Sequence, residues 1–243
     1  MYYDYFWFLG AILVCMLFAG IANAKVNRAF SKYAKVRNSS GMTGYDTAVR
    51  LMRANDVYGI SVGRVRGRLS DHYHPSKKIV NLSESTYGDA SVSAVAVSAH
   101  EIGHVLQKKK GYLFYHIRTA LVPVVNIGSF LAMPLVIVGI IMDLMATTAD
   151  YNTGFYVALV GVALYGASFL FALITLPVEL NASRRAKKML LAEGILTKEE
   201  MAGAGEVLSA AALTYLAGLL TSLVYFLRFM LYVLAIFGRR SNK

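Results

Sequence analysis

The sequence predicts a mainly α-helical membrane protein, with about four transmembrane helices and a small cytoplasmic α+β domain. Three observations predict this fold: the composition, the long apolar stretches and the distribution of basic residues. Of the 243 residues, 56% are hydrophobic and 16% are charged, whereas soluble domains are nearer about 45–50% and about 25%. This composition disfavours a disordered chain and a plain soluble enzyme. The single Cys15 excludes an intrachain disulfide framework and a multi-cysteine metal site.

A helix needs roughly 20 apolar residues to cross the hydrocarbon core of a bilayer. Three stretches meet this requirement: residues 5–24, 121–145 and 155–176. The second contains Pro123 and Pro134, which membrane helices tolerate where neighbouring groups satisfy the backbone. A further apolar stretch, residues 207–237, is longer and carries Arg228. It is either one tilted spanning helix, which we favour, or a span followed by a piece that lies in the membrane interface.

The basic residues are concentrated in two segments. Of the 25 Lys and Arg residues, 16 lie between Lys25 and Arg118 and five between Arg184 and Lys198, while residues 1–24 and 119–183 contain none. Because cytoplasmic loops of membrane proteins collect Lys and Arg, both segments are predicted to face the cytoplasm. The absence of a base before residues 5–24 indicates an uncleaved anchor with its N-terminus outside, not a signal peptide. No aromatic-and-basic pattern accompanies the charge, which disfavours a nucleic-acid partner and leaves the lipid bilayer as the partner of these bases.

The first basic segment is predicted to fold as a compact α+β unit. A helix is expected to begin at Thr43 or Gly44, because Thr and Gly are suitable N-cap residues. It is expected to end near Asn55. Residues 60–65 and 79–82 have the pattern of short strands. From about Asp89 the chain reads as one long helix that Gly111 ends.

This long helix contains the sequence HEIGH, at residues 100–104. His100 and His104 are four residues apart, so they share one helix face and can bind one zinc ion. Glu101 lies beside that face, where it can accept a proton from the attacking water and later pass it to the leaving amine. The competing interpretation is a structural helix with two satisfied polar histidines.

A catalytic zinc site needs a third protein ligand. The extended motif with a third histidine six residues after His104 is absent, because Lys110 stands there. The contenders are His72, His74, His116 and Glu179. Glu179 is favoured because it emerges from the third apolar stretch, which would hold it rigidly, although an acid at that place can also be a simple surface charge.

A second polar cluster precedes the strand at residues 79–82. It contains Asp71, His72 and His74, and in one interpretation it adjoins an edge strand that pairs with an extended substrate. One of these histidines, or Tyr73, would then donate to the oxyanion of the tetrahedral intermediate. The simpler interpretation is a polar turn. His116 follows two tyrosines and is expected at the membrane interface.

In these stretches the sequence resembles the YugP-type neutral zinc metallopeptidases, membrane proteins related in organisation to the HtpX-like gluzincins. The matching residues are 69–75, 82–83, 87, 93–107 and 178–186, and the resemblance covers nearly the whole chain. The resemblance implies a Zn²⁺-dependent endopeptidase with a zincin-like domain, in which His100, His104 and Glu179 are ligands and Glu101 is the base. One departure is Asn181, where the family usually carries Asp, so the charge around the ligands differs here.

Together these inferences predict a multi-pass plasma-membrane protease whose active site faces the cytoplasm. Its expected substrates are unfolded or membrane-associated polypeptides. A membrane scaffold or adaptor without proteolytic activity is the alternative, and a transporter is disfavoured because Asn126 is the one strongly polar side chain deep in an expected span. The expected segments are a membrane anchor (1–24), a protease segment (25–118), a transmembrane hairpin (119–178), a cytoplasmic segment with the third ligand (179–206) and a transmembrane or interfacial tail (207–243).

The predicted topology can be tested with single cysteines introduced into a Cys15→Ser background. Thr148→Cys should react with a membrane-impermeant maleimide on intact cells, because it lies in the base-free turn between the two hairpin helices. Lys77→Cys and Lys187→Cys should react only after the cells are opened. Labelling of Lys77→Cys in intact cells would overturn the cytoplasmic placement.

Overall fold

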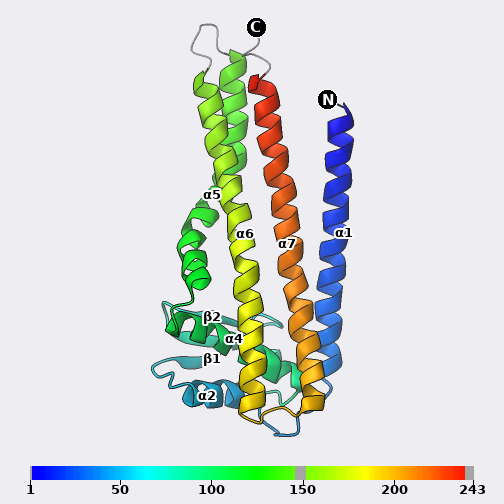
Figure 1. Ribbon diagram of the computed structural model, residues 1–243, viewed down its shortest axis with the longest axis vertical. Coiled ribbons are helices and arrows are strands. Elements are labelled where there is room, and N and C mark those ends of the chain that lie inside the picture. The colour runs from blue at the N-terminus through cyan, green and yellow to red at the C-terminus, as the bar shows by residue number, and fades with distance from the viewer. Residues whose placement is uncertain (1, 146–151, 239–243) are drawn as a thin grey trace. The chain divides into compact units, whose positions relative to one another are not determined.

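The computed structural model describes residues 2–145 and 152–238 (Figure 1). The expected outside turn at residues 147–154 falls mostly outside the described residues, as do Arg239, Arg240 and Lys243. The described chain is mostly helical with one small sheet.

Four long helices dominate the fold: α1 (Tyr2–Tyr33), α5 (Leu113–Met145), α6 (Asn152–Ala192) and α7 (Lys198–Gly238). Each contains a segment that is long and apolar enough to cross a membrane. The tail is one continuous helix, not a span followed by a separate interfacial piece. Pro123 and Pro134 lie inside α5, and Pro177 lies inside α6.

Three shorter helices belong to the predicted α+β unit: α2 (Gly44–Ala54), α3 (Glu84–Tyr87) and α4 (Val92–Lys109). Thr43 caps α2 in a capping box with Asp46, which satisfies backbone donors that the first turn leaves free. Ser91 caps α4, the helix that carries the HEIGH sequence. Beyond its C-cap, Gly111 adopts a φ of +65°, a left-handed conformation that glycine reaches without strain.

The sheet has three strands in the order β1 (Ser61–Val65), β3 (Ile79–Ser83) and β2 (His72–His74). β1 pairs with β3 in parallel, and β2 pairs with β3 in antiparallel fashion, with Tyr73 opposite Val80. The strand expected at residues 79–82 is therefore central and not an edge. The edge strands are β1 and β2, and β2 is formed by residues for which a polar turn is the simpler expectation. The pairing with β3 supplies hydrogen bonds that a pattern of three residues could not reveal.

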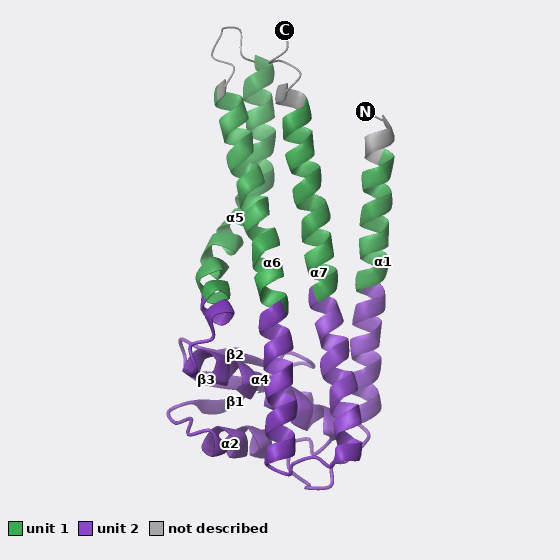
Figure 2. Ribbon diagram, in the orientation of Figure 1, with its two compact units in different colours: residues 1–19, 117–176, 216–243 green, residues 20–116, 177–215 purple. Residues whose placement is uncertain are grey.

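The chain divides into two compact units (Figure 2). Unit 1 comprises residues 1–19, 117–176 and 216–243. Close helix packing holds it together: a Cβ on Gly139 would come within 2.5 Å of backbone atoms of α6. Tyr165 and Phe229 stack with ring centroids 4.5 Å apart. Arg228, the charge in the tail, lies over the ring of Phe8 at 5.1 Å, where a cation–π contact offsets part of its burial cost.

Unit 2 comprises residues 20–116 and 177–215. Its core forms where β3, α2, α4 and the end of α6 meet, around the fully buried residues Leu51, Leu82, Ile102 and Leu190. The two helices α4 and α6 come into contact at Gly103. A Cβ at that position would lie 2.6 Å from the carbonyl oxygen of Ala182, closer than real Cβ contacts allow.

Gly103→Ala should therefore destabilise the protein, because the added methyl group must push two backbones apart. We expect a loss of about 1–3 kcal/mol, the usual cost of overpacking. Gly205→Ala is the matched control: Gly205 also lies inside a helix of unit 2, but nothing lies within 4 Å of its Cβ position. The control should be neutral or slightly stabilising, since alanine favours helix.

The measurement is thermal unfolding of both full-length variants in the same detergent. Equal midpoints for Gly103→Ala and Gly205→Ala would contradict the close approach.

Candidate metal centre

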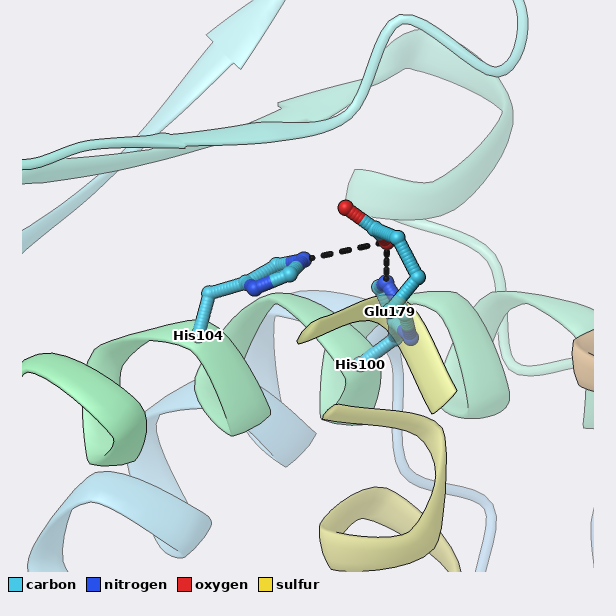
Figure 3. Close-up of side chains that lie close together, drawn as sticks. All are labelled: His100, His104 and Glu179. Atoms are coloured by element: carbon cyan, nitrogen blue, oxygen red, sulfur yellow. Dashed lines mark hydrogen bonds and ion pairs between the residues drawn. The ribbon is translucent and has the colours of Figure 1, made fainter. Parts of the chain in front are cut away.

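Three side chains from two helices converge at one point in unit 2. His100 and His104 come from α4, and Glu179 comes from α6; a ligand atom from each lies within 4.8 Å of the others. Glu179 Oε2 is 3.1 Å from His100 Nε2 and 3.4 Å from His104 Nε2. Figure 3 shows both rings and the carboxylate turned toward one another. Of the four contenders for a third ligand, the structure brings Glu179 to the histidine pair.

Local structure explains this convergence. Histidines four residues apart on a helix lie on one face, and the two rings meet edge to face with centroids 4.8 Å apart. Glu179 is 2% exposed and His104 is 8% exposed. Burying a carboxylate costs free energy unless hydrogen bonds or opposite charges compensate for the lost water. The position of the Glu179 carboxylate therefore depends on the polar groups that surround it.

A buried amide fixes the orientation of His104. Gln107 is fully buried, and its Nε2 donates to the backbone oxygen of Val178 at 2.7 Å and to Asn181 Oδ1 at 3.1 Å. A backbone oxygen can only accept a hydrogen bond, and so Gln107 must present its NH₂ group to Val178. Its Oε1 therefore faces His104 Nδ1, at 2.9 Å.

It follows that His104 carries a proton on Nδ1, because a carbonyl oxygen needs a donor there. The lone pair of Nε2 then points at Glu179, whose carboxylate oxygen also carries lone pairs. Two acceptors facing each other repel unless a proton or a cation lies between them. The donor set therefore fits a cation, and two imidazoles with one carboxylate are ligands typical of catalytic zinc.

His100 is oriented from α6. Its Nδ1 lies 3.1 Å from Ser183 Oγ, and Ser183 is four residues after Glu179, one helical turn further along α6. Each histidine thus has a hydrogen-bond partner on the nitrogen that faces away from Glu179, an arrangement that sets ring orientation in metal sites. Asn181, the departure from the usual Asp, accepts from Gln107 and from Arg185 Nε, the latter at 2.7 Å.

Glu101 occupies a different environment beside the two histidines. It is 7% exposed, and burial is the main reason that its pKa rises to about 7. The nearby carboxylates Glu179 and Asp71 raise this pKa further, whereas His100 and a hydrogen bond from the backbone N–H of Tyr73 lower it. A carboxyl group with a pKa near neutrality can both accept and release a proton at cellular pH.

The second polar cluster contributes its backbone and Asp71 to this site, not its histidines. Asp71 accepts from the backbone N–H of Ser83 at 2.7 Å and from the Ser83 hydroxyl at 2.9 Å, which ties the start of β2 to the end of β3. His72 Nε2 lies 3.0 Å from Asn81 Nδ2, and His74 Nδ1 accepts from the backbone N–H of Lys77. Within the described residues, neither histidine joins the metal-ligand group.

Sequence reasoning missed Gln107, Ser183 and the Tyr73 backbone. Gln107 is three residues after His104 and Ser183 four after Glu179, so helical periodicity places each beside a proposed ligand. That spacing is the signal that could have found them. Their partners lie on the facing helix, and no pattern within either segment shows that contact.

A family model described as "Putative neutral zinc metallopeptidase" matches residues 7–234. The chain belongs to this family. It is 42% identical over 221 residues to the protein of Bacillus subtilis (strain 168) named "Putative membrane protease YugP", and the match covers 91% of this chain and 93% of that protein. No solved structure matches the chain.

Membership of the zinc metallopeptidase family confirms the resemblance on which the sequence interpretation drew. It supports a peptidase that uses zinc, and the name of the Bacillus protein agrees with the four membrane-length helices.

Gln107→Leu tests the tautomer argument. Leucine has about the volume of glutamine, but it lacks the oxygen that accepts from His104 Nδ1 and the NH₂ group that donates to the Val178 oxygen. Zinc affinity should fall about 10–100-fold, the usual loss when a partner of a ligating histidine is removed. The measurement is competition for zinc against a chelating dye. A Gln107→Leu variant with native circular dichroism and unchanged zinc affinity would contradict the assignment.

Proposed function

We propose that this protein is a membrane-integral zinc endopeptidase that hydrolyses peptide bonds at the cytoplasmic face. The observation that carries the proposal is the convergence of His100, His104 and Glu179 beside the buried carboxyl of Glu101. These three side chains are the proposed ligands of Zn²⁺, and Glu101 is the proposed general base.

The reaction places distinct demands on the residues of this chain. When bound, zinc would act as a Lewis acid that polarises the substrate carbonyl and makes water acidic enough to react near neutral pH. Glu101 takes a proton from the attacking water on its carboxylate and then delivers it to the nitrogen of the leaving amine. The Tyr73 backbone favours the carboxylate form of Glu101, the form that accepts the proton.

The free edge of β2 offers a binding surface for the substrate. Among the described residues β2 pairs with β3 alone, which leaves its other edge unpaired, and the Tyr73 backbone influences the pKa of Glu101. An extended polypeptide beside this edge would present its backbone to the base, as peptides do when they add to a sheet. Unfolded or membrane-associated segments suit such a site, and membrane protein processing or quality control is the corresponding cellular role.

The orientation of the protein rests on charge. The segments 25–118 and 179–206, which contain the four site residues, also hold 21 of the 25 Lys and Arg residues. This distribution favours a cytoplasmic active site. Residues 1–24, 119–178 and 207–243 would then form the anchor, the hairpin and the tail.

Glu101→Gln tests the general base. The amide keeps the size of the side chain and leaves all three proposed ligands, but it cannot accept the proton. Proteolysis of denatured casein should fall by a factor of about 10²–10⁴ while zinc remains bound at one ion per chain. Full activity with stoichiometric zinc would remove Glu101 from the role, and a wild-type protein that binds zinc without cleaving would favour the scaffold alternative.

Glu179→Ala tests the third ligand against the competing histidines. Metal content after dialysis against a weak chelator should fall far more in Glu179→Ala than in His72→Ala or His116→Ala, because those histidines lie outside the metal-ligand group. The site is built differently if Glu179→Ala keeps its zinc and His72→Ala or His74→Ala loses it.

A further inference from the structure

A pocket of about 380 Å³ lies in unit 2, between the carboxyl-terminal half of α4, the loop after α2 and the hairpin of β2 and β3. Its walls include Val105 on α4 and Tyr73 on β2. Both connect it to the candidate site: Val105 directly follows His104, and the Tyr73 backbone lies close enough to Glu101 to influence its pKa. The volume is within the range of about 300–1,000 Å³ that small-ligand sites occupy.

The pocket and the proposed base share one face of α4. Glu101, Val105 and Lys108 follow the i, i+4, i+7 spacing that places residues in one row along a helix. With a rise of about 1.5 Å per residue, Val105 and Lys108 lie roughly 6–10 Å along the axis from Glu101. An extended peptide covers that distance in two or three residues, at about 3.3 Å each.

The charges around the pocket are mainly positive. Lys78, Lys108 and Lys109 line it together with one acid, Asp56. Among the described residues, no carboxylate oxygen lies within ion-pair distance of these three lysines. The apolar lining residues Val57, Ile60 and Val105, together with the three lysines, are complementary to a short carbon chain that ends in an anion.

Backbone contacts hold two of the three cations in place. Lys108 Nζ donates to the oxygen of Pro75 at 3.0 Å, and Lys109 Nζ donates to the oxygens of Asn55 and Asp56 at 2.8 and 2.6 Å. An ammonium group has three donors, so each keeps at least one for a ligand. Because neutral carbonyls and not carboxylates hold them, no negative partner offsets their charge, and the entropy cost of ordering them is met before a ligand binds.

We propose that this pocket is a specificity subsite that binds an acidic side chain of the polypeptide substrate, two or three residues from the bond that is cut. The inference rests on the proposed peptidase function and deepens it, because it names the substrate class: polypeptides with Asp or Glu at that distance from the cleavage point. Lys78 is the selecting residue to substitute, since its side chain is exposed and, among the described residues, bonds to no backbone group; glutamate and lysine meet the same steric demand at its φ of +51°.

The test uses the full-length protein in detergent with zinc and pairs of quenched-fluorescence peptides that differ only by Glu or Gln at one position. The pairs cover the three positions on either side of the bond that is cut. At one position two or three residues away, kcat/KM should be about tenfold higher for Glu than for Gln, and the preference should shrink at high salt. Lys78→Glu should abolish the preference and favour Lys at that position.

Lys77→Glu is the matched control, because Lys77 is the adjacent exposed lysine and does not line the pocket. It should keep the preference for Glu. Equal kcat/KM for Glu and Gln at every position, or equal effects of Lys77→Glu and Lys78→Glu, would overturn the subsite while leaving the peptidase proposal intact.

A second arm separates the subsite from the peptidase activity. Fluorescence anisotropy of the same peptides with the Glu101→Gln variant measures binding without turnover. Tighter binding of the Glu peptide, lost in Glu101→Gln/Lys78→Glu, supports the pocket even if the wild-type protein cleaves none of them. Equal binding of the Glu and Gln peptides overturns it.

Discussion

The candidate site depends on the close approach of two helices at Gly103. A side chain at this position would meet the backbone of Ala182, so only glycine allows α4 and α6 to come this near. The approach brings His100 to Glu179, which is 79 residues away in the chain. It also lets Gln107 reach Val178 and Ser183 reach His100. A small increase in the separation would lengthen all of these hydrogen bonds at once, because they cross the same contact.

The contact between the helices is polar where it surrounds the site and apolar elsewhere. Ile102 and Leu190 are fully buried in the core, whereas the side chains around the histidines are an amide, a hydroxyl and two carboxyls. Buried polar groups are tolerated when they are hydrogen-bonded, and Gln107 satisfies this by using both ends of its amide. The Gln107 contact leaves His104 Nε2 without a proton, facing the Glu179 carboxylate. A cation is therefore the natural complement of the folded site, and folding and metal binding should support each other.

The features that the sequence predicts best are those set by the spacing of residues within one segment. The capped helix at α2, the long helix ended by Gly111 and the shared face of His100 and His104 follow from periodicity and capping residues. The grouping of Glu179 with the histidines was predictable because it emerges from an apolar stretch that fixes its place. The edge strand β2 was not, because a three-residue strand becomes a strand only through its partner. The role of Gln107 was also hidden, because it depends on a backbone oxygen of another helix. The pocket beside Tyr73 combines residues from α4, the sheet and the loop after α2.

In the sequence, two apolar stretches of membrane-spanning length separate Glu179 from the two histidines, and this order affects how the protein is synthesised and purified. Both histidines leave the ribosome well before Glu179, and residues 121–145 and 155–176 must be synthesised between them. A nascent chain that has not yet completed this hairpin holds only two of the three proposed ligands. For the same reason, excising residues 25–118 as a soluble fragment would discard one proposed ligand together with its helix, so biochemical work requires the whole chain in a detergent or a bilayer.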